Sequence, residues 1–389
     1  MNGLFKFLKG DRVIWFVVIL LSFFSLLAVY SSTGTLSYKY QSGNTEHYLY
    51  KHARIFLISF ILLFIAHKIK YTYYSRISLV AILLAIPLLW LTLLLGTNLN
   101  DASRWITVPG TGLTFQTSDF AKLALLLYLA RVLSRKQDKI KDFREAFIPV
   151  MLPVVAVCGS ILPANFSTAA VLFGTSMVVM FIGRVNLKYI GIMIGAGLVM
   201  LTIFISLSMV TYKAGMVNSI NQRVYTWINR TTSFADGNSE SNYQAEQAKI
   251  AIATGGLTGK GPGGSTQRNF LPHPYSDFIY AIIIEEYGFI GGALVLLLYI
   301  LLFYRCILIV KKNPRAFAAL LSVGCGFSLV FQGMINMAVA TSLGPVTGQP
   351  LPLLSMGGTS IIFTAIAIGI ILSVSREAEN EEGGSLETA

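Results

Sequence analysis

Apolar runs of about 20 residues recur along this chain of 389 residues, and they constrain its fold more than any other feature. A helix of that length crosses the roughly 30 Å of hydrocarbon in a lipid bilayer. Charged residues make up 12% of the chain, against roughly 25% in soluble domains. The sequence therefore predicts an all-α, polytopic membrane protein.

About ten segments fit a membrane-spanning helix by length and hydrophobicity. Their predicted ranges are 13–32, 52–70, 77–97, 119–135, 146–162, 167–183, 190–211, 277–304, 316–341 and 358–375. We expect one transmembrane domain over residues 1–375. The polar residues 376–389, which include Gly and Ser, predict a disordered cytoplasmic tail.

Lys and Arg residues concentrate in alternate connections between the predicted spans, which is typical of the cytoplasmic side of a membrane protein. We therefore place both termini in the cytoplasm. This distribution accounts for the net charge of +12, so we expect no nucleic-acid partner. The cytoplasmic set is Lys6, Lys9, Arg12, Lys68, Lys70, Arg76, Arg135, Lys136, Lys139, Lys141, Arg144, Arg184, Lys188, Arg305, Lys311, Lys312, Arg315 and Arg376.

The longest connection, residues 212–276, joins the seventh and eighth spans and is predicted to be a large extracytoplasmic loop. A plain connector does not need this length, so the outer face is the predicted functional face. Within the loop, the composition of Ala245–Ala253 favours a helix. The piece GGLTGKGPGG lacks the preceding strand of a nucleotide site, and Gly261 stands where a P-loop needs Ser or Thr. It predicts either a flexible turn or backbone amides that approach an anion.

Charged residues near the outer surface are the first candidate functional residues. Asp119 and Lys122 are three residues apart at the start of an apolar helix, so they share a face. An ionisable residue in a span predicts a function, although a lysine can also snorkel to the interface. Arg104, beside Trp105, is either an interfacial anchor or a cation that faces phosphate oxygens.

The stretch LPHPYSDFIYAIIIEEYG puts three carboxylates at or inside a predicted span. Asp277 can cap the helix that follows, and it can also serve as a general base at the outer interface. Glu285 and Glu286 lie about 12–14 Å deeper along the helix. We expect them to be polar anchors that bond to neighbouring helices.

Two side-chain amides and one loop are the remaining polar features near the predicted spans. Gln332 and Asn336 are four residues apart inside a span, where such side chains commonly bond across helices. The segment GPVTGQPLPLLSMGGTS precedes the last span. Irregular backbone at membrane depth must be covered by protein or line a cavity.

Three segments in this order resemble the SEDS family, the shape, elongation, division and sporulation proteins that include RodA and FtsW. They are ASRWI…FQTSDFAKLALLLYLA, GKGPGGSTQRNFLPHPYSDFIYAIIIEEYGFIGG and GPVTGQPLPLLSMGGTS. The resemblance covers nearly the whole chain. It implies a peptidoglycan glycosyltransferase that polymerises lipid II, an undecaprenyl-pyrophosphate-linked disaccharide peptide, at the outer face of the bacterial cytoplasmic (inner) membrane. It also implies a cognate class B penicillin-binding protein transpeptidase and other division or elongation proteins as partners.

The resemblance also implies roles for individual residues. Asp277 matches the family's essential aspartate, in a segment that reads Y-S-D-F here and H-T-D-F in the family. Arg104 and Lys122 match positions that line the polar site. Asp119 replaces a glutamate, and Asn165 replaces the aspartate of a P-D-x-G-T segment. FtsW-like proteins of the Bacteroidetes look similar at the latter segment, which favours a division protein.

In the mechanism that the resemblance implies, Asp277 deprotonates or orients an attacking sugar hydroxyl. Arg104 and Lys122 neutralise a leaving lipid pyrophosphate. A divalent cation, Mg²⁺ or Mn²⁺, can assist through a carboxylate and phosphates, although the chain has no dedicated metal site. Three further candidate substrate-binding cations lie in the long loop: Arg223, Lys260 and Arg268.

Two other functions are open at this point. A lipid II flippase or transporter would use the intramembrane charges to gate a polar pathway, and broken helices or inverted repeats would support it. A non-catalytic scaffold of the division machinery would need only its partner-binding surfaces.

Overall fold

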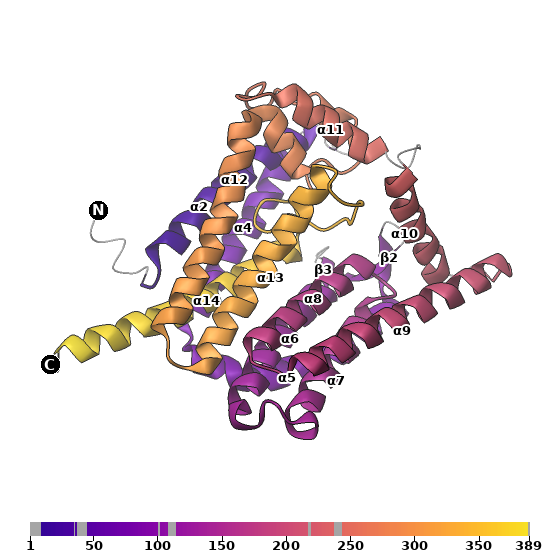
Figure 1. Ribbon diagram of the computed structural model, residues 1–389. Coiled ribbons are helices and arrows are strands. Elements are labelled where there is room, and N and C mark those ends of the chain that lie inside the picture. Colours follow the sequence, from indigo (N-terminus) through magenta and orange to yellow (C-terminus); the bar gives the residue numbers. More distant parts are fainter. Residues whose placement is uncertain are drawn as a thin grey trace. The chain divides into compact units, whose positions relative to one another are not determined.

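The computed structural model describes residues 9–34, 36, 45–99, 102–107, 114–216, 219–236 and 243–387 (Figure 1). The chain divides into two compact units. Unit 1 comprises Met1–Lys70, Ser233–Lys312 and Cys325–Ala389, and unit 2 comprises Tyr71–Thr232 and Asn313–Gly324.

Unit 1 is a bundle of long apolar helices. Its elements are α2 (Arg12–Ser32), α4 (Thr45–Lys68), α11 (Tyr243–Gly255), the short η4 (Gln267–Asn269), α12 (Ile279–Lys312), residues 325–340 of α13 (Ala316–Ala340) and α14 (Thr359–Glu387). Helices α4 and α14 approach closely at Gly369, where an added Cβ would lie 2.5 Å from the carbonyl oxygen of Leu63. A small residue at such a crossing lets two membrane helices pack backbone to backbone.

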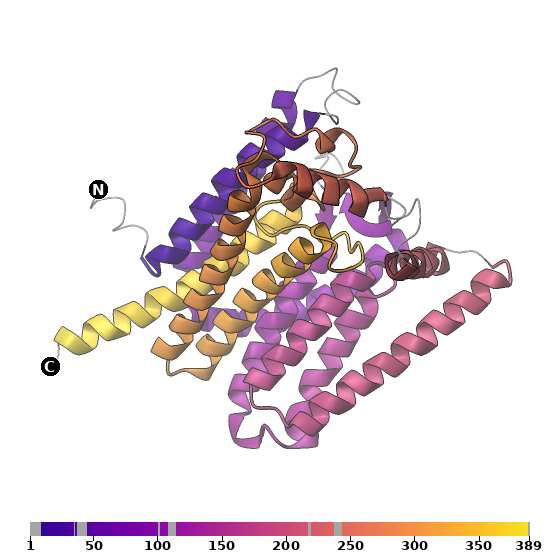
Figure 2. The ribbon, with the colours of Figure 1, turned by 45° about the horizontal axis from the view of Figure 1, so that its top comes forward.

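Unit 2 combines helices with a small sheet. It contains α5 (Tyr71–Leu95), β1 (Thr97–Leu99), β2 (Ala102–Thr107), β3 (Thr114–Gln116), α6 (Thr117–Arg135), η1 (Gln137–Lys139), η2 (Phe143–Phe147), α7 (Ile148–Ile161), α8 (Phe166–Ile182), α9 (Leu187–Lys213) and most of α10 (Ser219–Asp236). Helix α9 lies at the edge of this unit (Figure 2). Of its 27 residues only Ile190, Met193 and Ser208 are buried, which fits a helix that faces lipid.

Each of the ten predicted spans overlaps a helix, although some bounds differ by several residues, and the all-α polytopic class is confirmed. Among the described residues, eight helices are long and apolar enough to cross a membrane: α2, α4, α5, η2 with α7, α9, α12, α13 and α14. The other two predicted spans, α6 and α8, do not meet these requirements of length and low charge. Helix α8 has 17 residues, and α6 carries Asp119, Lys122, Arg131 and Arg135 within 19 residues.

The structure corrects the sequence predictions at three places. The connection before α6 contains a three-stranded antiparallel sheet in the order β1-β2-β3, where the sequence predicted no strands. Its short strands contain the β-branched and aromatic residues that favour a pleated surface. The long loop contains α10 as well as α11, and α11 includes the predicted helix at Ala245–Ala253.

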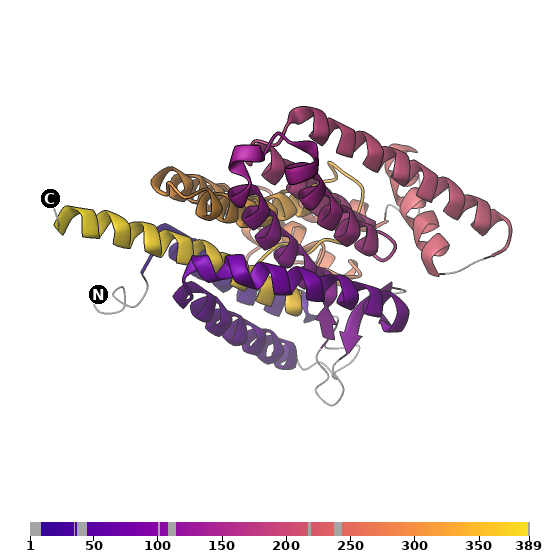
Figure 3. The same cartoon turned by 90° about the horizontal axis from the view of Figure 1, so that it is seen from below.

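The third correction concerns the C-terminal end. Helix α14 continues to Glu387, whereas we predicted a disordered tail from residue 376 (Figure 3). The sequence REAENEE consists mostly of Ala, Glu and Arg, which are strong helix formers, so the last span can extend without a break.

Candidate active site

Asp277 lies in a turn two residues before α12. The amides of Ala281 and Ile282 both donate to the carbonyl of Phe278, so Phe278 occupies the cap position of this helix. Asp277 is therefore one residue outside the cap position that we considered for it. Its half-buried carboxylate accepts a hydrogen bond from Ser276 Oγ at 2.9 Å.

Buried side chains hold the backbone of this turn. Asn336 Nδ2 donates to the carbonyl of Asp277 at 2.8 Å and to the carbonyl of Gln349 at 2.7 Å. Ser355 Oγ donates to the carbonyl of Ser276 at 2.6 Å. These bonds fasten the Asp277 turn to the connection between α13 and α14.

That connection passes directly beside the carboxylate. Gly348 has φ +64°, and a Cβ added there would lie 3.5 Å from Asp277 Oδ2. Gln332 Nε2 donates to the carbonyl of Pro350 at 2.9 Å. The two amides of α13, Gln332 and Asn336, therefore bond to this connection, where we expected bonds to neighbouring helices. Prolines supply many such carbonyls without amides of their own, so the loop needs outside donors.

Glu285 is fully buried and surrounded by donors from the long loop. Lys260 Nζ forms an ion pair with Glu285 Oε1 at 2.6 Å. Ser265 Oγ donates to Oε2 at 2.5 Å, and the amides of Thr266 and Gln267 donate at 3.1 and 3.2 Å. A buried carboxylate is tolerated when its charge is paired and its oxygens are satisfied in this way.

Glu286 forms a second link between the same loop and the helices. It accepts hydrogen bonds from Ser31 Oγ and, at 3.4 Å, from the amide of Ser265. Arg268 Nη1 donates to the Ser31 carbonyl at 2.8 Å and to its hydroxyl at 3.1 Å. Arg268 thus contacts α2, and its guanidinium is engaged by protein groups.

These contacts revise two predictions. We expected both glutamates to bond to neighbouring helices. Glu285 instead bonds to Lys260 and to the Ser265–Gln267 segment of the long loop. Glu286 bonds to Ser31 of α2 and also to Ser265. Lys260 and Arg268, which we predicted to bind substrate, bond to protein atoms in unit 1.

The Gly-rich piece of the loop packs against the backbone of α12. A Cβ at Gly259, which has φ +81°, would lie 2.2 Å from the carbonyl oxygen of Glu286. The amide of Gly261 donates to the same carbonyl at 2.9 Å. Helix α12 breaks at Gly288, where φ is 71° and a Cβ would lie 2.2 Å from the Leu257 carbonyl. Gly259 and Gly288 permit this close approach because they have no Cβ. The Gly261 amide is used in a hydrogen bond to a carbonyl of α12.

Unit 2 contains its own group of predicted site residues. Asp119, in the first turn of α6, is 4% exposed and pairs with Lys122 Nζ at 2.8 Å. In the sheet, Trp105 lies opposite Gln116, the residue immediately before α6. This pairing brings the backbone of Arg104 to the same end of α6; its side chain lies outside the described part of the structure.

The start of α8 lies near this group. Asn165 caps α8, since its side chain accepts a hydrogen bond from the Thr168 amide at 3.2 Å. An amide serves a helix cap as well as a carboxylate does, so the fold does not need the aspartate of the family segment. Arg223 Nη1 donates to the carbonyl of Ala164 at 3.3 Å. A cavity of about 20 Å³ connects Asn165 with Ser118, the neighbour of Asp119, and it has room for about one water molecule.

Within the described residues, no group of three or more His, Cys, Asp and Glu side chains could hold a metal ion.

Comparison with known proteins identifies the family. The sequence model of the FtsW, RodA and SpoVE cell cycle proteins matches residues 11–380. The chain belongs to this family. Stage V sporulation protein E of Bacillus subtilis (strain 168) is 33% identical over 375 residues, which cover 94% of this chain and 97% of that protein. A probable peptidoglycan glycosyltransferase FtsW of Geobacter sp. (strain M18) is 31% identical over 373 residues, with 94% and 96% covered.

Two solved structures share the fold of this chain. The rod shape determining protein RodA of Thermus thermophilus matches with a TM-score of 0.67 at 25% identity, over 95% of this chain and 97% of that one. A chain from a peptidoglycan synthase complex matches with a TM-score of 0.70 at 24% identity, over 95% and 98%. The predicted multi-pass membrane class is thereby confirmed. The predicted enzyme class agrees with the names of the FtsW relatives.

Proposed function

We propose that this chain polymerises lipid II into glycan strands by glycosyl transfer at the outer face of the cytoplasmic membrane. One observation carries the proposal. The FtsW/RodA/SpoVE match extends from residue 11 to residue 380, and relatives named as probable peptidoglycan glycosyltransferases align over almost their whole length. The aspartate that the family resemblance marks as essential is retained as Asp277.

Asp277 is the proposed general base. The 4-hydroxyl of one lipid-linked disaccharide attacks the anomeric carbon of a second lipid-linked sugar, and Asp277 takes the hydroxyl proton as the new bond forms. The bond from that carbon to the pyrophosphate breaks, and the lipid pyrophosphate leaves with the electron pair. The hydrogen bond from Ser276 Oγ and the fixed backbone of the turn support this role, since a base must be held in place.

Three cations that the sequence singles out are the proposed partners of the leaving group. Lys122 and Arg104 neutralise the pyrophosphate, and Arg223 contributes further positive charge to substrate binding. The Asp119 carboxylate, 2.8 Å from Lys122, orients this ammonium group. Because Lys260 Nζ bonds to both the fully buried Glu285 carboxylate and the Thr266 hydroxyl, we give it a structural role.

We further propose that a divalent cation, Mg²⁺ or Mn²⁺, binds together with the substrate. Mg²⁺ is usually held by one or two carboxylates plus phosphate oxygens, and Asp277 with a pyrophosphate would satisfy that need. When bound, the cation would supply positive charge to the leaving group. Chelation with EDTA should abolish glycan formation, and Mg²⁺ or Mn²⁺ should restore it. The unfolding temperature without lipid should not change; a large EDTA-induced decrease would instead indicate a metal held by the protein alone.

A class B penicillin-binding protein is the proposed partner. One structural relative is a chain of a peptidoglycan synthase complex that coordinates polymerization and crosslinking. A transpeptidase that crosslinks the strands made by this chain would complete the same pair of activities.

The break in α12 is the one observation that favours a transporter, because discontinuous helices line many transport sites. Here, however, backbone of the Gly-rich loop covers the break at Gly288. Proteoliposomes that contain lipid II distinguish the functions. Polymer formed by the purified chain, alone or with its class B partner, supports the proposal. Lipid II translocation without polymer would support a flippase, and neither activity would support a scaffold.

A further inference from the structure

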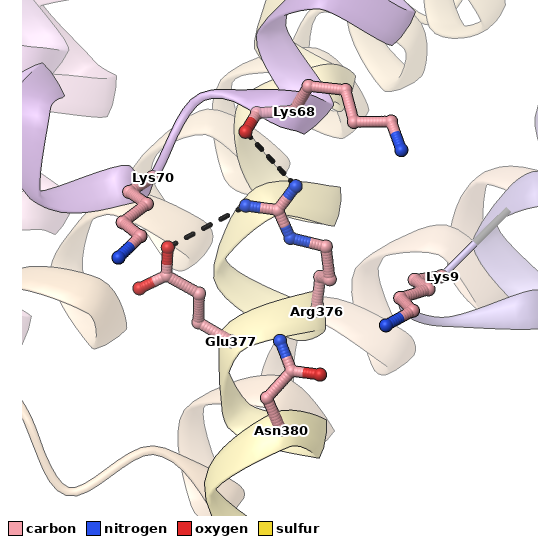
Figure 4. A pocket seen from close by; sticks show the side chains of 6 residues that line it. All are labelled: Lys9, Lys68, Lys70, Arg376, Glu377 and Asn380. Atoms are coloured by element: carbon pink, nitrogen blue, oxygen red, sulfur yellow. Dashed lines mark hydrogen bonds and ion pairs between the residues drawn. The ribbon is translucent and has the colours of Figure 1, made fainter. Parts of the chain in front are cut away.

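A basic pocket lies at one end of unit 1, where several of its helices begin or end (Figure 4). Helix α2 starts at Arg12, α4 ends at Lys68, and α14 passes the same place at Arg376. The pocket has a volume of about 440 Å³, and it is lined by Lys9, Lys68, Lys70, Arg376, Glu377 and Asn380.

The lining carries a clear excess of positive charge. Four cations and one carboxylate give 4 − 1 = +3. Among the described side chains, two other carboxylates belong to residues close to the lining in sequence, Asp11 and Glu379. Glu379 Oε2 accepts a hydrogen bond from the amide of Gly10 at 3.1 Å, and Asp11 Oδ2 pairs with Arg305 at 2.5 Å. Arg305 balances the charge of Asp11, whereas Glu379 keeps its negative charge because the Gly10 amide is neutral. The lining together with Glu379 therefore carries 3 − 1 = +2, which still favours an anionic ligand.

Arg376 is a fixed element of this pocket. Its side chain is only 12% exposed, and Nη1 donates to the Lys68 carbonyl at 3.1 Å. Nη2 lies 3.7 Å from Glu377 Oε1, so the guanidinium is held between α4 and its own helix (Figure 4). The Lys68 ammonium lies 5.1 Å over the ring of Phe64, which restricts it too. A fixed guanidinium with lysines around it suits the oxygens of a phosphate group.

The position of the pocket indicates where that phosphate comes from. Helices α2, α4 and α14 are all candidate membrane spans, and the ends of spans mark the level of the lipid headgroups. A volume of about 440 Å³ is within the usual range for a ligand site. Basic pockets between membrane helices can bind the headgroups of anionic lipids. We propose that this pocket binds the phosphate headgroup of an anionic membrane phospholipid.

Such a lipid would connect three parts of unit 1 that are distant in sequence: the segment before α2, the end of α4 and the C-terminal part of α14. This site is independent of the proposed transferase activity, because none of its residues belongs to the candidate active site.

Native mass spectrometry of the full chain in detergent tests this proposal, with phosphatidylglycerol as the probe. We expect one bound phosphatidylglycerol that survives activation better than phosphatidylcholine does. The variant Lys68→Gln/Lys70→Gln removes two exposed lysines of the pocket. At about the usual contribution of a lysine near an anionic surface, it should weaken binding roughly 30-fold. A second variant, Arg376→Lys, keeps the positive charge but loses the planar guanidinium group. It should therefore weaken binding, but less than Lys68→Gln/Lys70→Gln does.

The matched control is Lys311→Gln/Lys312→Gln, which removes two exposed lysines at the end of α12, outside the pocket. It should leave binding unchanged. Equal loss in the two lysine pairs, or equal binding of phosphatidylcholine, would overturn the proposal in favour of general surface charge. Displacement of the lipid by an equal concentration of inorganic phosphate would also overturn it and would indicate a site for a free anion.

Discussion

Asn336 shows how one buried side chain can position a reactive group. Its amide bonds to the backbone carbonyls of Asp277 and Gln349, so it ties the Asp277 turn to the connection that passes beside the carboxylate. The sequence predicted a polar role for Asn336 but not its partners. Serines that support the carboxylates, such as Ser31, Ser265 and Ser276, carry no signal that separates them from other serines.

Asn336→Ala should lower kcat for glycan formation at least about 10-fold, because a shift of about 1 Å in a catalytic group is costly. The matched control is Gln332→Ala, which removes a bond from the same helix to the carbonyl of Pro350. Asn336→Ala removes a donor from two carbonyls and Gln332→Ala removes one from a single carbonyl, so both variants should lower the unfolding temperature. The kcat of Gln332→Ala should change much less, with KM near that of the unmodified chain in both. Equal kcat in the two variants would contradict a positioning role for Asn336.

The pair of Lys260 and Glu285 provides a second prediction at this scale. Glu285→Gln should destabilise the fold by about 3 kcal/mol, because it breaks a buried ion pair. Lys260→Met should destabilise the fold less than Glu285→Gln does, since the Lys260 side chain is 30% exposed. A double-mutant cycle measured by unfolding should give a coupling of about 1–3 kcal/mol. The KM for lipid II should not change in Lys260→Met. Additive effects of the two variants on stability, or a raised KM in Lys260→Met, would support a role of Lys260 in substrate binding instead.

At the scale of elements, the Gly-rich turn and the first part of α12 form one structural piece. The close approach of Gly259 to the Glu286 carbonyl is a property of the folded chain, and GGLTGKGPGG alone could not reveal it. The spans were predictable because their length and hydrophobicity are local. The partners of Glu285 and Arg268 were not, because Arg268 contacts Ser31, 237 positions away in sequence.

Gly259→Ala should destabilise the chain by about 1–3 kcal/mol more than Gly261→Ala, because overpacking adds to the cost of a positive φ. Both glycines have positive φ, but a Cβ at Gly261 meets open space. Thermal unfolding in detergent compares the two variants directly. Equal unfolding temperatures would contradict the close packing of this turn on α12.

At the scale of the whole molecule, ten helices were predictable from hydrophobicity, and the small sheet and the two compact units were not. Three-residue strands such as Thr97–Leu99 are too short for a periodic pattern to appear. The candidate site was predictable mainly through the family resemblance. From the residues alone, Asp277 could equally have been a helix cap, and the structure places Phe278 at that position.

Addition of the cognate class B penicillin-binding protein should raise the rate of glycan formation several-fold if the two proteins work as one synthase. The rate with and without the partner, measured at equal concentrations of the chain, checks this. A catalytically inactive transpeptidase should stimulate as well, because the effect comes from binding. No stimulation at saturating partner would contradict a functional pair.

The most direct test of the central claim is the yield of glycan strands from purified lipid II by Asp277→Asn. This change keeps the shape of the side chain and removes its basicity, so we expect no detectable polymer. Asp138→Asn makes the same chemical change at an exposed residue and should leave the yield unchanged. Polymer from Asp277→Asn at the level of the unmodified chain would contradict the proposed base.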